Sequence, residues 1–436
     1  MKIKYILLVG IILFTGLNWY MLYSDTADNL QTYAQNMELA QEYDENEFYA
    51  DAILCYQKAL EIKPDEMSVK RAIALDYYNL KNYSKFVPAA LEYNSLVGGD
   101  LEMYTMLISY YISDNDLMRA FSYIDEAYTY FPDNAEVTKL YDSIKGNYRS
   151  QGTPFSKITE FRDGYAIYTY DSCGGIISSD GTVKTTKGKY EEIAGFNYDD
   201  EELIFSACKD GKYNFYDRYD YLRVSPSVSY DYLGTFCDGY ALVCKDGKWG
   251  YINENFEEKN IEYDNATQFI NEIAAVQKNG KWALINDELQ YVTEFVYEDV
   301  LVDDYNTCAV DKRIFVKQNG KYYMMNRKLE VLSKALDDAK PFVSDSGNAA
   351  VCIDGKWGLM NRDGELIIKC QYEDMGSSNE GFAPYKMNGK WGYVTERNEV
   401  LIEPVFEGAK AFNSLGYAAV KGSTNWYLIQ LSLYED

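Results

Sequence analysis

Histidine is missing from the sequence: none of the 436 residues is His. Without an imidazole the chain has no His-containing catalytic triad, no His-ligated metal site and no access to the commonest general base. Positive charge is also scarce, with 42 Lys and Arg against 68 Asp and Glu, which gives a formal net charge of −26. Nucleic acids and anionic lipid surfaces attract basic patches, so this balance disfavours both as partners.

Motifs of metal-binding and catalytic sites are missing as well. The eight cysteines show no Cys-x-x-Cys spacing, and the chain has no phosphate-binding loop, dinucleotide fingerprint or nucleophile elbow. Cys208, Cys244 and Cys352 all stand three residues before a turn glycine, which predicts a small buried slot that a free Cys fills. Disulfides are the alternative if the domain lies outside the cytosol. We therefore expect no enzyme activity, no cofactor and no metal site.

Residues 1–29 contain an apolar run from Tyr5 to Tyr23, preceded by Lys2 and Lys4. At 1.5 Å per residue in a helix, a run of about 19 residues nearly covers the hydrocarbon core of a bilayer. Its aromatic end and the preceding lysines predict an uncleaved signal anchor, with the N-terminus in the cytosol and the bulk of the chain outside. A cleaved signal peptide is the alternative.

Residues 30–150 carry a second pattern, a 34-residue period typical of helix-turn-helix repeats. The recurring positions are Tyr43, Ala52, Ala59, Pro64, Tyr77, Tyr111, Ala120, Ala127 and Pro132. On these residues the segment resembles the tetratricopeptide repeat family, with units near 33–66, 67–100 and 101–134. The middle unit departs from the family pattern, since Phe86 and Tyr93 stand where small residues are usual. The resemblance implies an α-solenoid whose groove holds a peptide or partner helix; a spacer or a dimerisation surface are the alternatives.

Residues 151–436 repeat one short phrase, as in DGKWGYIN at 246–253 and NGKWGYVT at 388–395. Asp-Gly and Asn-Gly are strong signals for a type I′ hairpin turn, so each phrase predicts a turn that opens a strand. The aromatic and glycine positions of the copies are Tyr213, Trp249, Gly250, Trp282, Tyr322, Trp357, Gly358, Trp391, Gly392 and Trp426. We expect the Trp to fill the gap between units and the Gly to permit close backbone approach. A sugar-stacking platform is the alternative.

Two further features recur once in each unit, a Lys before the aromatic and an aromatic-acid pair such as Tyr263-Asp264. One active site needs one such group, so their repetition indicates a scaffold. Asp303 and Asp304 lie outside the period, and we expect them in a solvated loop. Over 154–436 the chain resembles the WG-repeat (KWG) family of bacterial proteins, and the central copies are specific for it.

The two ends of the β region complement each other. Phe155 lies 35 residues before Tyr190 and so begins the portion of a unit that the last copy, around Trp426, lacks. A unit split between the two ends is how a propeller ring closes. We predict an α+β multidomain chain that ends in a β-propeller of seven or eight blades, with a β-solenoid as the alternative.

Together these features predict a membrane-anchored, extracytoplasmic protein-interaction scaffold without catalytic activity of its own. Its partners would be a protein or peptide held by the helical repeats, the membrane through the N-terminal helix, and a surface glycan. The alternative is a carbohydrate- or cell-wall-binding protein or enzyme that uses the β-repeat domain. In either case function is expected where the copies differ, in the long intervals at 190–209 and 299–316 and in the helical groove.

Overall fold

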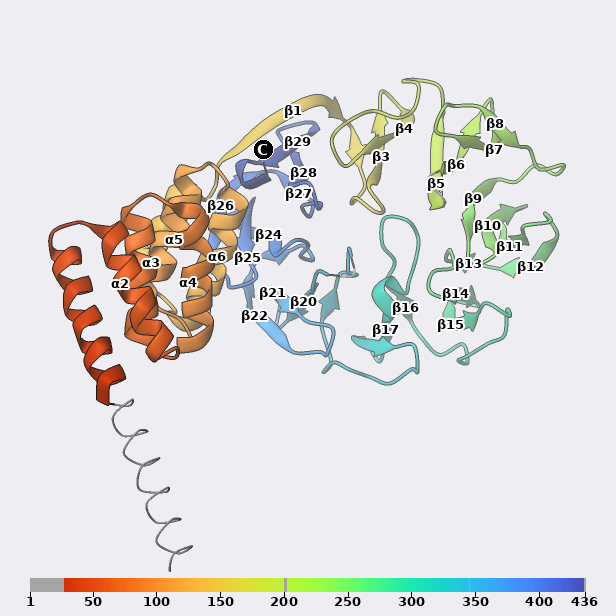
Figure 1. Cartoon of the computed structure of the whole chain (residues 1–436). Coiled ribbons are helices and arrows are strands. Elements are labelled where there is room, and N and C mark those ends of the chain that lie inside the picture. The colour runs from red at the N-terminus through yellow and green to blue at the C-terminus, as the bar shows by residue number, and fades with distance from the viewer. Residues whose placement is uncertain (1–26, 200–201, 345, 435–436) are drawn as a thin grey trace, which may run out of the picture. The chain divides into compact units, whose positions relative to one another are not determined.

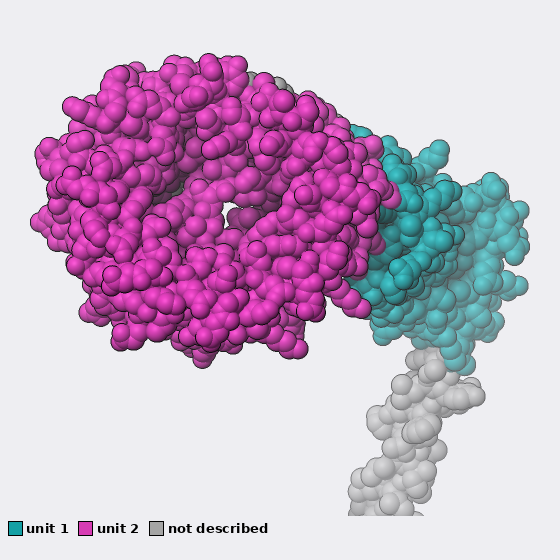
Figure 2. Space-filling view, turned by 180° about the vertical axis from the view of Figure 1, so that it is seen from behind, with its two compact units in different colours: residues 1–144, 436 teal, residues 145–435 magenta. Residues whose placement is uncertain are grey.

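The computed structural model describes residues 27–199, 202–344 and 346–434. The chain forms two compact units, unit 1 with residues 1–144 and 436, and unit 2 with residues 145–435 (Figure 2). Most of the predicted signal anchor at 1–29 lies outside the described residues. Within the part of the chain that is described, no helix has the length and apolar character needed to cross a membrane.

Unit 1 is built of antiparallel helices joined by short turns (Figure 1). A first helix occupies residues 27–45. The helices that follow it are α2 (Tyr49–Ile62), α3 (Met67–Asn79), α4 (Tyr83–Val97), α5 (Leu101–Ser113), α6 (Leu117–Tyr130) and α7 (Ala135–Ile144). The starts of α2, α4 and α6 are 34 residues apart, and so are those of α3, α5 and α7. The sequence period is therefore the period of the helix pairs.

Small residues permit the close packing of these helices. Ala52, Ala59, Ala120 and Ala127 are completely buried, as expected where two helices approach without room for a larger side chain. In the middle pair the same places hold Phe86 and Tyr93, which are also buried, and Tyr78 packs its ring 5.0 Å from that of Phe86. The middle helix pair thus keeps the 34-residue spacing although its buried side chains are larger.

Unit 2 consists of eight small antiparallel sheets, which we call blades I to VIII (Figure 1). Blade I contains β2 (Lys157–Ile158), β3 (Tyr165–Tyr170) and β4 (Cys173–Ser178). Blade II contains β5 (Glu192–Asp199), β6 (Glu202–Lys209), β7 (Lys212–Asp217) and β8 (Leu222–Val224). Blade III contains β9 (Tyr232–Cys237), β10 (Tyr240–Lys245), β11 (Lys248–Asn253) and β12 (Glu258–Tyr263). Blade IV contains β13 (Asn265–Ala266), β14 (Ile273–Lys278) and β15 (Lys281–Asn286).

The other four blades follow the same plan. Blade V contains β16 (Asp299–Val300), β17 (Arg313–Gln318) and β18 (Lys321–Asn326). Blade VI contains β19 (Asp338–Ala339), β20 (Ala349–Ile353), β21 (Lys356–Met360) and β22 (Leu366–Tyr372). Blade VII contains β23 (Asp374–Met375), β24 (Phe382–Met387), β25 (Lys390–Thr395) and β26 (Val400–Phe406). Blade VIII contains β27 (Gly408–Ala409), β28 (Tyr417–Lys421), β29 (Trp426–Leu431) and β1 (Tyr148–Phe155).

Blade VIII closes the ring, because its outer strand comes from the other end of the unit. Strand β1 runs antiparallel to β29, with Tyr148 opposite Leu431 and Phe155 opposite Trp426. The predicted split unit is confirmed, and the number of blades is eight. Such closure leaves no open end to the array, so the solenoid alternative is wrong.

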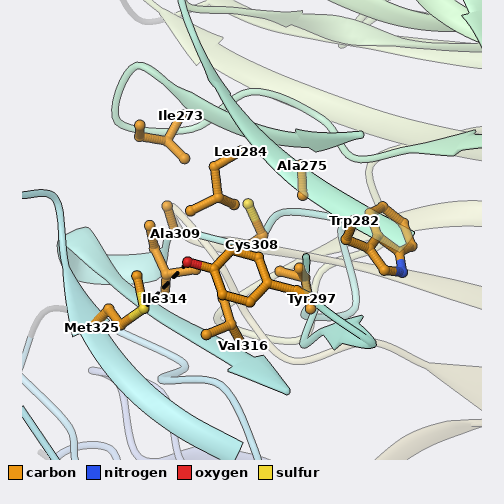
Figure 3. Packing of buried hydrophobic residues seen from close by; sticks show 11 residues of the cluster. Ile273, Ala275, Trp282, Leu284, Tyr297, Cys308, Ala309, Ile314, Val316 and Met325 are labelled. Atoms are coloured by element: carbon orange, nitrogen blue, oxygen red, sulfur yellow. Dashed lines mark hydrogen bonds between the residues drawn. The ribbon is translucent and has the colours of Figure 1, made fainter. Parts of the chain in front are cut away.

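The core lies between neighbouring blades. At the junction of blades IV and V, Trp282, Leu284, Tyr297 and Val316 pack together with Cys308 (Figure 3). Aromatic and β-branched residues suit such pleated, half-covered surfaces. The hydroxyl of Tyr297 points to the Met325 sulfur, 3.9 Å away (Figure 3). Each sheet is too small to bury a face alone, and stacking the blades buries it.

Candidate functional site: recurring joints and a central channel

The recurring phrase forms the turn that the sequence predicts. Asp246 and Gly247 both have positive φ, at 50° and 74°, as do Asn388 and Gly389, at 52° and 77°. A type I′ turn needs this conformation at both central residues. The aromatic that follows pairs with the residue that enters the hairpin, as in Cys244 with Trp249. Equivalent pairs are Cys208 with Tyr213 and Cys352 with Trp357, and the three cysteines are buried.

The glycine after the tryptophan has a steric cause. Between the pairs Trp357–Tyr372 and Leu359–Ile368 the outer strand β22 bulges over Gly358. A Cβ at Gly358 would lie 2.4 Å from the Ile368 carbonyl oxygen, well inside contact distance. Gly250 and Gly392 lie under equivalent bulges of β12 and β26. In blade IV, where β15 ends the sheet, the same place holds Ala283.

The tryptophans of the phrase are packing residues in their surroundings. Trp282 is buried, whereas Trp249, Trp357 and Trp391 are half-buried. Tyr232 of the same blade packs 5.3 Å from Trp249. The ammonium of Lys340 lies 4.8 Å from the ring centre of Trp357 and 5.3 Å from that of Trp391, and so joins blades VI and VII.

The recurring lysine and acid connect one blade to the next. Lys248 Nζ lies 2.8 Å from Asp264 Oδ1, and Asp264 Oδ2 accepts a 2.7 Å hydrogen bond from the amide of Asn279 in the next hairpin turn. Lys248 and this amide hold the pKa of Asp264 below its usual range. Lys321 and Asp337 repeat the contact, and Asp337 accepts from the amide of Gly355. These charged groups therefore serve the ring itself.

In unit 1, the predicted helical-repeat positions divide into two kinds. The alanines and Tyr111 are buried, and Tyr43 and Tyr77 are half-buried in the helix packing. Pro64 and Pro132 are exposed in the turns that follow α2 and α6. None of these positions brings reactive groups together. Among the described residues no group of three or more His, Cys, Asp or Glu side chains could hold a metal ion.

The sequence pointed to the interval 299–316 but did not predict that part of it crosses the channel of unit 2. This part comprises residues 302–309, between β16 and β17, and we call it the crossing segment. In Figure 1 it leaves β16 and enters the space that the eight sheets enclose. Its sequence signals were the interval from Trp282 to Tyr322, which at 40 residues is the longest between copies of the phrase, and the two acids Asp303 and Asp304 outside the period.

The crossing segment contacts blades I, II and IV. The Tyr305 hydroxyl donates a 2.6 Å hydrogen bond to the Glu160 carbonyl of blade I, and the Tyr305 ring lies 5.3 Å from Phe196 of blade II. The backbone N–H of Gln268, in blade IV, donates a 2.8 Å hydrogen bond to the backbone carbonyl of Asn306. Arg162 forms an ion pair with Asp303. The segment thus ties opposite sides of the ring together.

Asp303 and Asp304 lie in a loop, as expected, and Asp304 is exposed, but both acids form ion pairs with residues of other blades. Asp304 Oδ2 lies 2.6 Å from Lys410 Nζ of blade VIII and accepts a 2.7 Å hydrogen bond from the Glu160 amide. Lys410 also lies 3.9 Å from Glu160 Oε1. Burial raises the pKa of Glu160 to about 7, although Lys410 opposes the shift. The repeat pattern of the sequence does not predict this network, because its members belong to different blades.

Two cavities lie in the channel, whose hollow is visible in Figure 2. The loop cavity, of about 610 Å³, is lined by loops between first and second strands, with Arg162, Ser344 and Asn379 in its wall. The tryptophan cavity, of about 510 Å³, is lined by Glu160, Asp304, Lys410, Trp391 and Trp426, among others. Arg162 borders the loop cavity and Asp303 borders the tryptophan cavity, and the two residues form an ion pair with each other.

One family model and several solved structures are similar to parts of this chain. A family model described as "WG containing repeat" matches residues 229–249, 249–282, 325–357, 357–391 and 391–421. No curated protein matches the chain in sequence. Among solved structures, a eukaryotic initiation factor is 11% identical over 66% of this chain and 88% of its own, with a TM-score of 0.42. Hsv2p of Kluyveromyces lactis is 10% identical over 63% and 97%, with a TM-score of 0.37.

The AfRom2 CNH domain is 8% identical over 66% of this chain and 97% of its own, with a TM-score of 0.33. These likenesses are too distant to transfer a ligand or a partner. What remains is the architecture of the chain itself, with eight sheets, a ring closed by β1 and β29, and five segments matched to one repeat family. Unit 2 is an eight-bladed β-propeller that contains WG repeats.

Proposed function

We propose that the chain is a protein-interaction scaffold without catalytic activity, anchored in a membrane by residues 5–23 and displayed on its outer side. The propeller offers a wide surface, and its recurring polar groups are used in contacts between blades. The helical unit, whose pairs repeat every 34 residues, acts as a tetratricopeptide-like array with a groove for a peptide or partner helix. This division gives one chain two separate binding surfaces.

The observation that carries the proposal is an exposed apolar patch on blade II, which we call the β8 patch. It consists of Tyr219, Tyr221, Leu222, Val224 and Val228, and Tyr221 is 69% exposed. All three residues of β8 are exposed, whereas β12, β22 and β26 in other blades each contain buried positions. Contiguous exposed apolar groups of this kind mark interaction sites on soluble domains.

The geometry of the patch favours an extended protein segment as its occupant. Strand β8 ends the sheet of blade II, and no described strand pairs with its outer edge. Beside it lies a groove of about 680 Å³ lined by Phe215, Phe236 and Phe256. A strand added to β8 would place alternate apolar side chains toward this groove. With a net charge of −26 on the chain, a partner with a basic surface is attracted over long range.

The test is a photo-crosslinking amino acid placed at Tyr221 in the full chain and activated in intact cells. Leu366 is the matched control, since it is 45% exposed on an outer strand, β22 of blade VI. We expect one defined protein adduct from position 221 that a Leu222→Asp substitution abolishes, and none from position 366. Identical adducts from both positions, or none from position 221, would refute the proposal.

The location has its own test. Protease added outside intact cells should digest both units of a chain anchored as proposed, while a cytosolic marker survives. Full protection of the chain until the membrane is opened would contradict an extracytoplasmic position. A soluble chain released from the membrane fraction by salt alone would contradict the anchor.

A further inference from the structure

The tryptophan cavity has walls from several blades and from the crossing segment. Blades VI, VII and VIII contribute Lys340, Trp391, Lys421 and Trp426, and the crossing segment contributes Asp304. Its volume of about 510 Å³ is in the range of small-molecule sites, about 300 to 1,000 Å³. The cavity is therefore large enough for an organic ligand, and its chemistry can be read from the walls.

The charges of the cavity nearly cancel. Lys410 lies between Asp304 and Glu160, and Lys340 Nζ lies 2.7 Å from Asp374 Oδ1. The remaining wall acids have partners of their own, Asp303 with Arg162 and Glu407 with Lys390. An anionic ligand would have to compete with these carboxylates for the same ammonium groups. A neutral ligand with many hydroxyl groups does not, because it can donate to the acids and accept from the amines at once.

Spare polar capacity remains beside the two indoles. Lys421 borders the cavity, and within the described part of the chain its ammonium makes no hydrogen bond or salt bridge. It stands directly opposite Trp426 in the β28–β29 pair. Asp304 accepts both of its hydrogen bonds at Oδ2, so its Oδ1 is available. Indole rings next to hydrogen-bonding groups combine an apolar face with polar contacts.

From these observations we propose that the tryptophan cavity binds a neutral carbohydrate, with a sugar ring against Trp426 and its hydroxyl groups on Lys421 and Asp304. The C–H face of a pyranose ring is apolar and its edge carries hydroxyl groups, which matches this wall. The phrase aromatic is a packing residue in blades III and IV, where Trp249 and Trp282 border none of the described cavities. In blade VIII Trp426 packs against the core cluster around Phe155 and also borders the tryptophan cavity, where its ring can meet the sugar.

The test uses the full chain in a detergent that carries no sugar headgroup. Maltose, cellobiose and N,N′-diacetylchitobiose are titrated with tryptophan fluorescence and saturation-transfer NMR as readouts, and inorganic phosphate is titrated in parallel. Two substitutions remove proposed contacts, Trp426→Leu and Lys421→Met. Two matched controls change equivalent positions outside the cavity lining, Trp249→Leu and Lys386→Met, since Lys386 faces Trp391 as Lys421 faces Trp426.

We expect saturable binding of at least one of the saccharides, weakened about tenfold or more by Trp426→Leu and by Lys421→Met. Loss of one charged hydrogen bond is sufficient for such a change. The control variants should bind as the parent chain does. The proposal is overturned if none of the three saccharides binds, if Trp426→Leu and Lys421→Met bind like the parent chain, or if phosphate binds in preference. Lys421 makes no hydrogen bond or salt bridge among the described residues, so we expect Lys421→Met to fold, and this variant keeps the test decisive if Trp426→Leu unfolds.

Discussion

Replacing Gly358 by Ala tests the steric explanation of the Trp-Gly pair. The added Cβ would lie 2.4 Å from the Ile368 carbonyl oxygen and 2.8 Å from the Cys370 nitrogen. Ordinary contacts between such atoms are about 3.5 Å, so β22 must retreat by about 1 Å and strain its pairing with β21. Overpacking of this kind costs about 1–3 kcal/mol. For a unit of this size that corresponds to a fall in Tm of about 2–5 °C.

The assay is thermal unfolding of the full chain followed by tryptophan fluorescence. Five of the six tryptophans belong to unit 2, and the sixth, Trp19, precedes the described residues. The signal therefore follows the propeller and not the helices. Gly392→Ala should behave alike, because its Cβ would lie 2.3 Å from the Ile402 carbonyl oxygen.

The matched control is Gly422→Ala in the last hairpin turn. There the added Cβ would lie 3.3 Å from the Tyr427 ring, a side chain that can move, and the glycine does not have positive φ. We expect its Tm to stay within about 1 °C of the parent value, because Gly-to-Ala changes are near neutral where the backbone fits. Equal Tm values for Gly358→Ala and Gly422→Ala would refute the steric explanation.

Three other perturbations have defined outcomes. Phe155→Ala removes a buried ring that packs 4.9 Å from Tyr168 beside the ring closure, and should cost about 3–5 kcal/mol in urea unfolding of unit 2; a loss below about 1 kcal/mol would contradict this. Burial next to Asp44 raises the pKa of Asp76 from 3.8 to about 8, so the folded state binds this proton more tightly than the unfolded state does. The stability of the helices, followed by circular dichroism, should therefore fall as the pH rises from 4 to 8. Asp76→Asn should flatten this pH dependence, and an unchanged pH dependence would contradict the role of the Asp44–Asp76 pair. Burial likewise raises the pKa of Glu160 from 4.5 to about 7, so propeller stability should decline across that interval, and the decline should be absent from Glu160→Gln if this carboxyl causes it.

Much of the fold could be predicted because its causes are local and repeated. The turn phrase at Asp246-Gly247 sets a hairpin by backbone conformation alone, and counting such phrases gives the number of blades within one. The repeat spacing is also kept along the chain. The position of Phe155 relative to Tyr190 therefore predicted that the two ends of unit 2 share one blade. The 34-residue helical period follows from spacing for the same reason. The assignment of unit 1 to the tetratricopeptide family stays a prediction.

The channel could not be predicted because its contacts are neither local nor repeated. Arg162 and Asp303 are 141 positions apart, and Lys410 lies 106 positions from Asp304. A pair of acids in a long interval has the composition of a solvated loop, and only the closed ring brings cations to it. The tryptophan cavity could not be predicted for the opposite reason, since Trp426 has the same sequence signature as the phrase tryptophans that border no described cavity.

Ring closure also dictates the order in which the molecule can form. The partners Phe155 and Trp426 are 271 positions apart, and the cost of joining distant segments grows with the length of chain between them. During synthesis blades I to VII can assemble one after another, but β1 has no partner until β29 leaves the ribosome. Until then both flanks of the arc carry unpaired backbone groups, the situation in which sheets add to other chains. A stalled or truncated nascent chain therefore exposes unpaired sheet edges, which the pairing of β1 with β29 removes in the closed ring.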